Sequence, residues 1–476
     1  MSGAVLDYLA RRRDRTLAEL RDLVAIPSVS SLPEHAADIR RCAAWVAEEL
    51  ERVGLRRVEI REPGGHPLVY GEWTEAGPGA PTVLLYGHYD VQPPDPLELW
   101  TSPPFEPTIR DGCLYGRGVS DNKAQFFLNL KVLEALLAVE GSLPCNVKVL
   151  IEGEEELRAD NLERFVAAHA DLLEADLALC SDAMLFGPGV PGIPLAIRGM
   201  AALDVRVRSA RADLHSGIYG GTVPNALHAA AELVAGLHGP DGRVLVEGFY
   251  DRVREVDPEE RSAWAELPMS DEEFSSEAGV TALPGEAGFT PAERLWARPS
   301  LDVHGLWGGF RGEGIKTVIP AEARFRLSCR LVADQRPDEI VRLLAAHLAA
   351  SAPEGCRVEI VGSLAGCSPV TTPRDHPAVT AALAALRAGY EREPVLFRAG
   401  WSVPAVEILD RVLGIDSLML GFGLATDNHH APDEHIRLDH FDRGLETMAR
   451  LWPAFADLPR RGAAAVRPLP PQPRAA

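Results

Sequence analysis

Three features are missing from this sequence of 476 residues, and each argues against a class of protein. No apolar run approaches the roughly 20 residues that cross a bilayer. The seven cysteines include no Cys-x-x-Cys pair, which argues against a thiolate metal site and a disulfide framework. Basic residues are also not in excess over acidic ones, since the formal net charge is −21. This argues against a surface that binds nucleic acid or an anionic membrane. Because the first residues carry no long apolar core of the kind found in a secretory leader, we expect a cytoplasmic protein.

The composition that is present describes an ordinary globular chain. Apolar residues make up 46% of the sequence and charged residues 25%. A chain of this length exceeds what one hydrophobic core supports, so two or three domains are expected. The net negative charge is compatible with a site that binds divalent cations.

The first part of the chain alternates helix-like and strand-like segments. Amphipathic patterns predict helices over residues 4–24 and 38–53. Strand-like runs follow at 58–60, 82–86, 145–151 and 177–180, with helical stretches at 121–140 and 160–173 between them. This alternation predicts an α/β domain with a mostly parallel sheet and helices on both faces.

From about residue 199 the pattern changes. Strands that alternate between apolar and polar residues are predicted at 202–207 and 323–331, with a further strand at 357–361 and helices at 224–238 and 337–350. An acidic stretch at 255–298 is predicted to be irregular. The sequence therefore predicts an α+β domain inserted into the first, which gives the following order: 1–198, first domain; 199–372, insert; 373–460, first domain resumed; and 461–476, a Pro/Ala-rich disordered tail.

The most informative motif is Gly87-His88-Tyr89-Asp90, directly after the strand-like run 82–86. A strand period of two puts His88 and Asp90 on the same side. Metal-bound imidazoles usually donate their second ring nitrogen to a carboxylate, and open α/β sheets build their sites at the carboxyl ends of strands. One His-x-Asp alone is more often a polar turn, so the motif needs support from elsewhere in the chain.

Four further clusters of metal-ligand residues supply that support. Taken singly, each is more typical of a helix cap or a solvated acidic turn. Taken together, they offer imidazole and carboxylate donors without thiolates, which suits zinc, manganese or cobalt, and a bridging carboxylate would make a two-metal hydrolase. The clusters contain Asp121, the acidic run Glu152 to Glu156, Ser181-Asp182, and the segment from Asp427 to Glu434.

This ordered set of motifs resembles the two-zinc exopeptidase family that includes cytosolic non-specific dipeptidase, carnosinase, glutamate carboxypeptidase and aminoacylase. The motifs are Gly-His-Tyr-Asp-Val-Gln-Pro, Leu-Tyr-Gly-Arg-Gly-x-x-Asp-Asn-Lys, Glu-Gly-x-Glu-Glu, Ser-Asp, Asp-Leu-His-Ser-Gly and His-x-x-x-Glu. The resemblance runs from about residue 20 to about 455. It is closest to the dipeptidase/carnosinase branch through the segments 213–221, 299–305 and 316–320.

The resemblance implies two divalent ions per subunit, with zinc first and manganese or cobalt as alternatives. It assigns His88 and Asp182 to one ion, Glu156 and His430 to the other, and Asp121 to both. The spacing to Glu434 favours His430 over His429 as the ligand. The spacing from Glu152 favours Glu155 as the general base and Glu156 as the metal ligand. If Glu154 took part instead, either assignment would shift by one position. A cis peptide bond after Asp121 is also implied.

The resemblance further implies the catalytic and substrate-binding residues. Glu155 would be the general base, Asp90 would orient His88, and His215 would reach the oxyanion from a partner subunit, which implies a homodimer. The insert would be the lid and dimerisation domain of a metallohydrolase. The residues expected to bind the substrate are His215, Thr317, Arg330, His376 and Ser402.

These motifs predict a metal-dependent exopeptidase that hydrolyses dipeptides or short peptides. The alternative is an N-acyl-amino-acid amidohydrolase of the aminoacylase or deacetylase type with the same two-metal site. A scaffold protein that has lost catalysis would lack a ligand or the base, and none is missing. One departure bears on the substrate: Trp401 interrupts the Arg-Glu-Gly-Gly-Ser-Ile-Pro pattern usual in the dipeptidase branch.

Overall fold

The computed structural model describes residues 3–157 and 160–461, which form two compact units. The first unit consists of Met1–Leu195, Thr372–Phe397 and Val403–Ala476, and the second of Ala196–Thr371 with Arg398–Ser402. The predicted disordered tail, 461–476, lies outside the described residues except for its first position. Among the described helices, none is both long and apolar enough to cross a bilayer.

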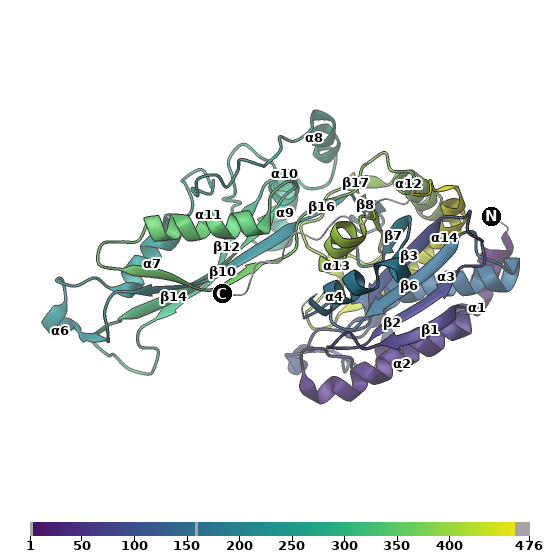
Figure 1. Ribbon diagram of the computed structural model, residues 1–476, viewed down its shortest axis with the longest axis horizontal. Coiled ribbons are helices and arrows are strands. Elements are labelled where there is room, and N and C mark those ends of the chain that lie inside the picture. Colours follow the sequence, from purple (N-terminus) through teal and green to yellow (C-terminus); the bar gives the residue numbers. More distant parts are fainter. Residues whose placement is uncertain (1–2, 158–159, 462–476) are drawn as a thin grey trace. The chain divides into compact units, whose positions relative to one another are not determined.

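The first unit is built on a six-stranded sheet of order β1-β2-β6-β3-β7-β18 (Figure 1). From β6 to β18 the neighbouring strands are parallel, whereas the β1–β2 and β2–β6 pairs are antiparallel. A mostly parallel sheet is thus confirmed. The strands are β1 Arg56–Arg61, β2 Leu68–Trp73, β6 Asn146–Glu152, β3 Thr82–His88, β7 Leu177–Cys180 and β18 Ser417–Met419.

Both faces of the central strands β3, β6 and β7 are buried, as the continuous apolar runs of the sequence predict, whereas the edge strand β1 is partly exposed. In β3, Val83 and Leu85 belong to the main hydrophobic core of the unit, whereas Leu84 and Tyr86 alternate with them and are also fully buried. The period of two therefore sends successive side chains into two separate layers. His88 continues the series of Leu84 and Tyr86.

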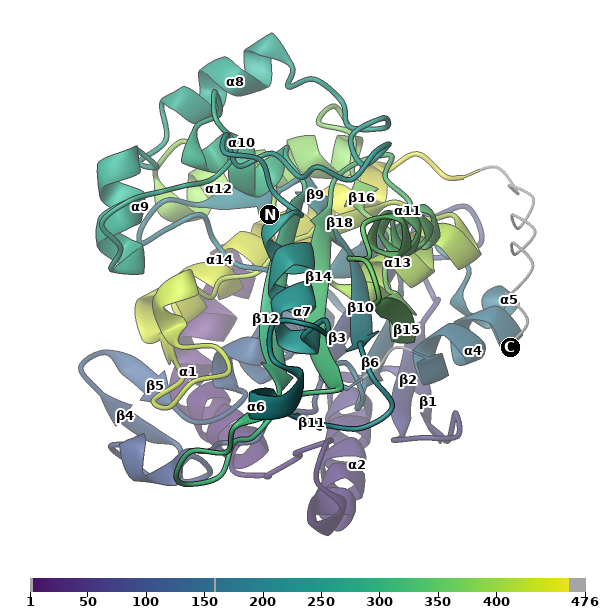
Figure 2. The same ribbon diagram turned by 90° about the vertical axis from the view of Figure 1, so that its left-hand side faces the viewer.

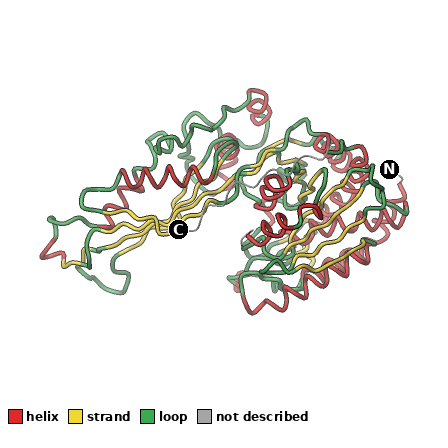
Figure 3. Tube along the Cα trace, viewed as in Figure 1, coloured by secondary structure: helices red, strands yellow, loops and turns green. Residues whose placement is uncertain are grey.

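Helices surround the sheet, and Figure 3 distinguishes the helices, in red, from the strands, in yellow, along the chain. α3 is buried around nearly its whole circumference because it packs against α1, α2 and α14. Its first residues follow a π-helical turn at Val119–Lys123 that carries Asp121. The helices of this unit are α1 Gly3–Val24, α2 Ala36–Val53, α3 Ala124–Glu140, α4 Asp160–Ala168, α5 Ala170–Leu173, α12 Pro377–Tyr390, α13 Pro404–Ile408 and α14 Leu438–Ala454.

The second unit has an antiparallel four-stranded sheet of order β12-β14-β10-β15. The long central pair runs in register from Gly199 opposite Leu331 to Arg208 opposite Glu322. Helices α7 and α11 cover one face and share a single hydrophobic core with the strands. The elements are β10 Gly199–Arg208, β12 Ser300–Gly308, β14 Glu322–Leu331, β15 Arg357–Ala365, α7 Ala226–Ala235 and α11 Pro337–Ala350.

The acidic stretch 255–298 is not irregular, and that prediction is corrected here. It forms three short helices, α8 Pro258–Ala265, α9 Asp271–Ala278 and α10 Pro291–Trp296, which Figure 2 shows close together. Ser270 with Glu273 and Thr290 with Glu293 form capping boxes, and the side chain of Asp257 caps α8. The acidic residues are enriched here because carboxylates at a helix N-terminus accept its free N–H groups and oppose its dipole.

Candidate metal centre

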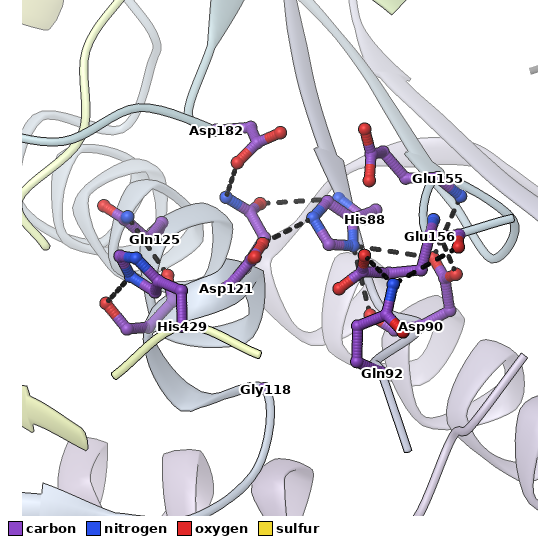
Figure 4. Close-up of polar contacts among 12 residues, drawn as sticks. His88, Asp90, Gln92, Gly118, Asp121, Gln125, Glu155, Glu156, Asp182 and His429 are labelled. Carbon is purple, nitrogen blue, oxygen red and sulfur yellow. Dashed lines mark hydrogen bonds and ion pairs between the residues drawn. The ribbon is translucent and has the colours of Figure 1, made fainter. Parts of the chain in front are cut away.

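The candidate site lies at the carboxyl ends of neighbouring parallel strands. β3 ends at His88, β6 ends at Glu152 and β7 ends at Cys180. His88 lies directly opposite Glu152 in the β3–β6 register. Because parallel neighbours end at one edge of a sheet, the loops after them bring His88, Glu155 and Asp182 together. Figure 4 shows the side chains of Glu155 and Asp182 around the His88 ring.

Asp121 occupies the centre of this group. Its Oδ1 lies 3.0 Å from Nε2 of His88, and its Oδ2 lies 3.0 Å from Nε2 of His430. The carboxylate therefore lies between two imidazoles, His88 and His430, that are far apart in the sequence. The peptide bond between Asp121 and Asn122 is cis, as the resemblance implies.

The donor atoms fall into two groups, each within 4.8 Å: His88, Glu155 and Asp182 in one, and Asp121, Glu156 and His430 in the other. Imidazole nitrogens and carboxylate oxygens are the donors that zinc and related divalent ions bind. The residues present therefore fit a metal centre. A third acidic group at Glu19, Glu49 and Glu134 does not fit, because the ammonium of Lys131 already pairs with all three carboxylates.

Asp90 positions both the histidine and the acidic loop. Its side chain is fully buried, and its Oδ1 lies 3.5 Å from Nδ1 of His88, which also hydrogen-bonds to the backbone carbonyl of Asp90 at 3.1 Å. The same carboxylate accepts the backbone N–H groups of Glu155 at 3.2 Å and Glu156 at 3.1 Å. Through its carbonyl and its carboxylate, Asp90 thus links the imidazole at the end of β3 to the loop after β6. Sequence spacing alone did not reveal this link.

The three adjacent glutamates point in different directions. Glu154 accepts a hydrogen bond from the Asn161 amide, away from the two donor groups. Glu156 lies 3.3 Å from His430 and accepts a hydrogen bond from Gln92 at 2.8 Å. This is the arrangement in which Glu155 and Glu156, rather than Glu154, face the histidines.

The two adjacent histidines also have different partners. His430 faces Asp121 and Glu156, whereas His429 lies 2.9 Å from the Ser120 hydroxyl. That hydroxyl donates in turn to Asp427. His429 therefore belongs to a polar group behind Asp121, and His430 is the one placed among the donor atoms.

Glu434 is a site residue that the sequence analysis used only for its spacing. It is buried, and its carboxylate accepts the backbone N–H groups of Gly118, Ser120 and Asp121 at 2.8, 3.0 and 3.1 Å. It also accepts a hydrogen bond from the buried Arg117 guanidinium at 2.7 Å. Glu434 therefore holds the turn that carries Asp121. The sequence signal that could have identified this role is the position of Glu434, four residues after the predicted ligand His430.

The electrostatics of the site favour a bound cation. Burial raises the pKa of Asp182 to about 7 and raises that of Glu155 well above its ordinary value. The pKa of Asp121 is lowered although burial opposes this, because His430 and His88 hydrogen-bond to its carboxylate. Buried carboxylates that crowd each other need positive charge nearby, and a divalent ion supplies it.

The predicted substrate-binding residues are distributed over both units. Within the second unit, Arg330 donates a hydrogen bond to the Ser402 hydroxyl at 2.8 Å. His215 is exposed and lies on the short strand that pairs with Val318–Ile319, and the Thr317 carbonyl accepts the N–H of Ser216. His376 belongs to the first unit, where its side chain caps α12.

An α/β domain with two groups of histidine and carboxylate donors, one of them at the strand ends of its parallel sheet, has the site of a metallohydrolase. The model of Peptidase family M20/M25/M40 matches residues 84–454, and the chain belongs to this family of metallopeptidases. The predicted resemblance, the fold class and the assignment as a peptidase enzyme are therefore confirmed.

Individual relatives agree with this assignment. The chain is 31% identical to the cysteinylglycine-S-conjugate dipeptidase of Corynebacterium striatum, covering 90% of this chain and 92% of the relative. It is 28% identical to the human Beta-Ala-His dipeptidase, covering 95% and 92% of the two chains. Among solved structures, an M20 family metallo-carboxypeptidase from Sulfolobus solfataricus matches with a TM-score of 0.82 at 31% identity, covering 93% of this chain and 99% of that one.

Proposed function

We propose that this protein hydrolyses dipeptides in a metal-dependent reaction. The observation that carries the proposal is the carboxylate of Asp121 between two imidazoles in a member of this peptidase family. The relatives named above are dipeptidases and a carboxypeptidase, which supports dipeptide hydrolysis and not the N-acyl-amino-acid alternative.

In this proposal the centre would hold two divalent ions, with zinc first and manganese or cobalt as alternatives. His88 and Asp182 would hold one ion, Glu156 and His430 would hold the other, and Asp121 would contribute to both. When bound, the ions activate water and polarise the peptide carbonyl. Asp90 keeps the His88 ring oriented, and its two hydrogen bonds from the acidic loop keep Glu155 and Glu156 in place.

Glu155 performs the proton transfers. It accepts a proton from the attacking water as the new carbon–oxygen bond forms, and it delivers this proton to the leaving nitrogen as the carbon–nitrogen bond breaks. Burial raises its pKa, which helps the carboxyl group to hold the proton between the two steps. His215 stabilises the oxyanion, and Arg330 with Ser402 binds the substrate carboxylate. Thr317 and His376 complete the proposed contacts.

His215 is proposed to act from a partner subunit, so that the functional form is a homodimer and the second unit serves as lid and dimerisation domain. β14 runs ten residues from Glu322 to Leu331 and is therefore about 30 Å long at ~3.3 Å per residue. Arg330 lies near its end, whereas His215 pairs with the segment just before its start. One substrate cannot contact both residues of one chain across that distance, which supports a second copy. A cytoplasmic location stays a prediction.

A mixed dimer tests the position of His215. His215→Ala and Glu155→Gln should each have little activity when expressed alone. Co-expressed with different affinity tags and purified as the mixed dimer, they should regain up to half of the wild-type kcat, because one site then combines an intact Glu155 with the partner's intact His215. A mixed dimer no more active than its parents would show that His215 does not act across an interface.

The proposed function is tested with metal-stripped protein. Zinc, manganese or cobalt is added back separately, and hydrolysis of several dipeptides is compared with that of the matching N-acetyl amino acids. We expect no activity without metal and dipeptide hydrolysis at least about tenfold faster than deacetylation in kcat/KM. Faster deacetylation would reassign the substrate class, and full activity in the stripped protein would contradict the metal requirement.

A further inference from the structure

The loop Arg398–Ser402 carries Ser402, the hydrogen-bond partner of Arg330, and the structure explains how this loop is held. We propose that the acidic segment α8–α10 positions this loop for binding the substrate carboxylate, with Glu260 acting through Arg398. The loop contains neither helix nor strand, so its conformation depends on the groups around it. This inference rests on the proposed function, because it names the part of the chain that supports the substrate contact.

The first connection is the ion pair between α8 and the start of the loop. Arg398 donates from Nη2 to Glu260 Oε2 at 2.5 Å and from Nε to Oε1 at 3.2 Å, which is the two-point geometry that fixes a guanidinium in place. The guanidinium also lies 5.3 Å from the ring centre of Trp264. Trp264 is itself buried and packs edge-on against Trp296 of α10.

The second connection runs from α10 to the middle of the loop. A Cβ atom added at Gly400 would lie 2.7 Å from Cδ1 of Leu295, so the loop backbone lies directly against this helix. Arg198 adds a bridge, because its guanidinium donates to the carbonyls of Arg294 and Arg298 at 2.8 and 2.6 Å. Its backbone N–H donates to the carbonyl of Trp401 at 2.9 Å.

These contacts give the acidic segment a role in specificity. The loop is held by groups that α8 and α10 supply or anchor, together with the hydrogen bond from Ala399 to the Ala196 carbonyl and the one from Arg330 to Ser402. Ser402 follows Trp401 directly, so a shift of the loop moves the hydroxyl that orients Arg330. A misplaced guanidinium weakens binding of a carboxylate without affecting the proton transfers at the metal centre. Glu260 is thus a positioning residue for the substrate carboxylate.

The test compares Glu260→Gln with Glu266→Gln, an equal charge change at an exposed position of the same segment. In zinc-loaded protein we expect Glu260→Gln to raise KM for a dipeptide about five- to tenfold with kcat within about twofold. The inhibition constant of the matching dipeptide amide, which lacks the carboxylate, should stay within about twofold of wild type. Glu266→Gln should match wild type in all three quantities.

Two double-variant comparisons make the assignment specific. In an Arg398→Gln background, Glu260→Gln should change KM no further, since the residue it acts through is gone. Gly400→Ala should raise KM because it presses on Leu295, and adding Leu295→Ala should restore KM to within about twofold of wild type. Additive effects, or no rescue, would overturn the proposed connection.

The outcomes separate this inference from the function on which it rests. A wild-type protein that cleaves no dipeptide with any metal would overturn both. Wild-type dipeptide cleavage with an unchanged KM in Glu260→Gln would overturn this inference alone. So would an equal weakening of the dipeptide and its amide, because the loop would then have no selective effect on the carboxylate.

Discussion

Replacement of Glu155 by Gln is expected to lower kcat for dipeptide hydrolysis by about 10²- to 10⁴-fold, the range found when a general acid–base group is lost. Glutamine has the same shape but cannot accept and return a proton. The backbone N–H of residue 155 still donates to Asp90, so the loop should keep its position. Metal content should therefore stay at the wild-type stoichiometry, measured by elemental analysis of dialysed protein beside the steady-state assay.

Glu154→Gln is the matched control, because it makes the same change one residue away. The Glu154 side chain is directed to Asn161, so we expect kcat within about threefold of wild type. If Glu154→Gln lost activity and Glu155→Gln kept it, the assignment of the base would be wrong by one position. If neither lost activity, general-base catalysis by this acidic run would be excluded.

Glu434→Gln is expected to destabilise the protein by about 3–5 kcal/mol, the cost of leaving one partner of a buried ion pair alone. Arg117 and Glu434 are each only 1% exposed, so water cannot replace the lost charge. Three backbone N–H groups around Asp121 also donate to this carboxylate, and the NH₂ of glutamine would face donors instead of accepting from them. The turn that carries Asp121 should loosen, and the protein should bind metal more weakly.

Urea unfolding of the metal-free protein measures the change in the free energy of unfolding. A competition assay with a chelator measures the metal affinity. Glu446→Gln provides the control, since it makes the same change at an exposed position of α14 and should alter stability by less than about 0.5 kcal/mol. A stability of Glu434→Gln within that margin of wild type would contradict the positioning role. Normal metal affinity in a destabilised variant would limit that role to folding.

Much of the α/β domain could be predicted because its signals are local. The buried strands at 82–86, 145–151 and 177–180 are short apolar runs, and all three appear in the structure. The third has the predicted bounds, and the other two differ by one or two residues at an end. β2, Leu68–Trp73, was not predicted, since it contains both a glycine and a glutamate. The short helices between 255 and 298 were missed because each has at most eight residues, too few for a clear apolar period.

The sequence by itself determined which residues can bind metal, because donor type is a property of each side chain and strand ends can be recognised from composition. The tertiary structure decided how those donors divide into two groups, since this depends on strand order and on which loops meet. It also decided the role of Glu434, which binds backbone groups more than 300 positions away, and the association of Arg398–Ser402 with the second unit. Contacts between distant segments follow from packing, and no local pattern encodes them.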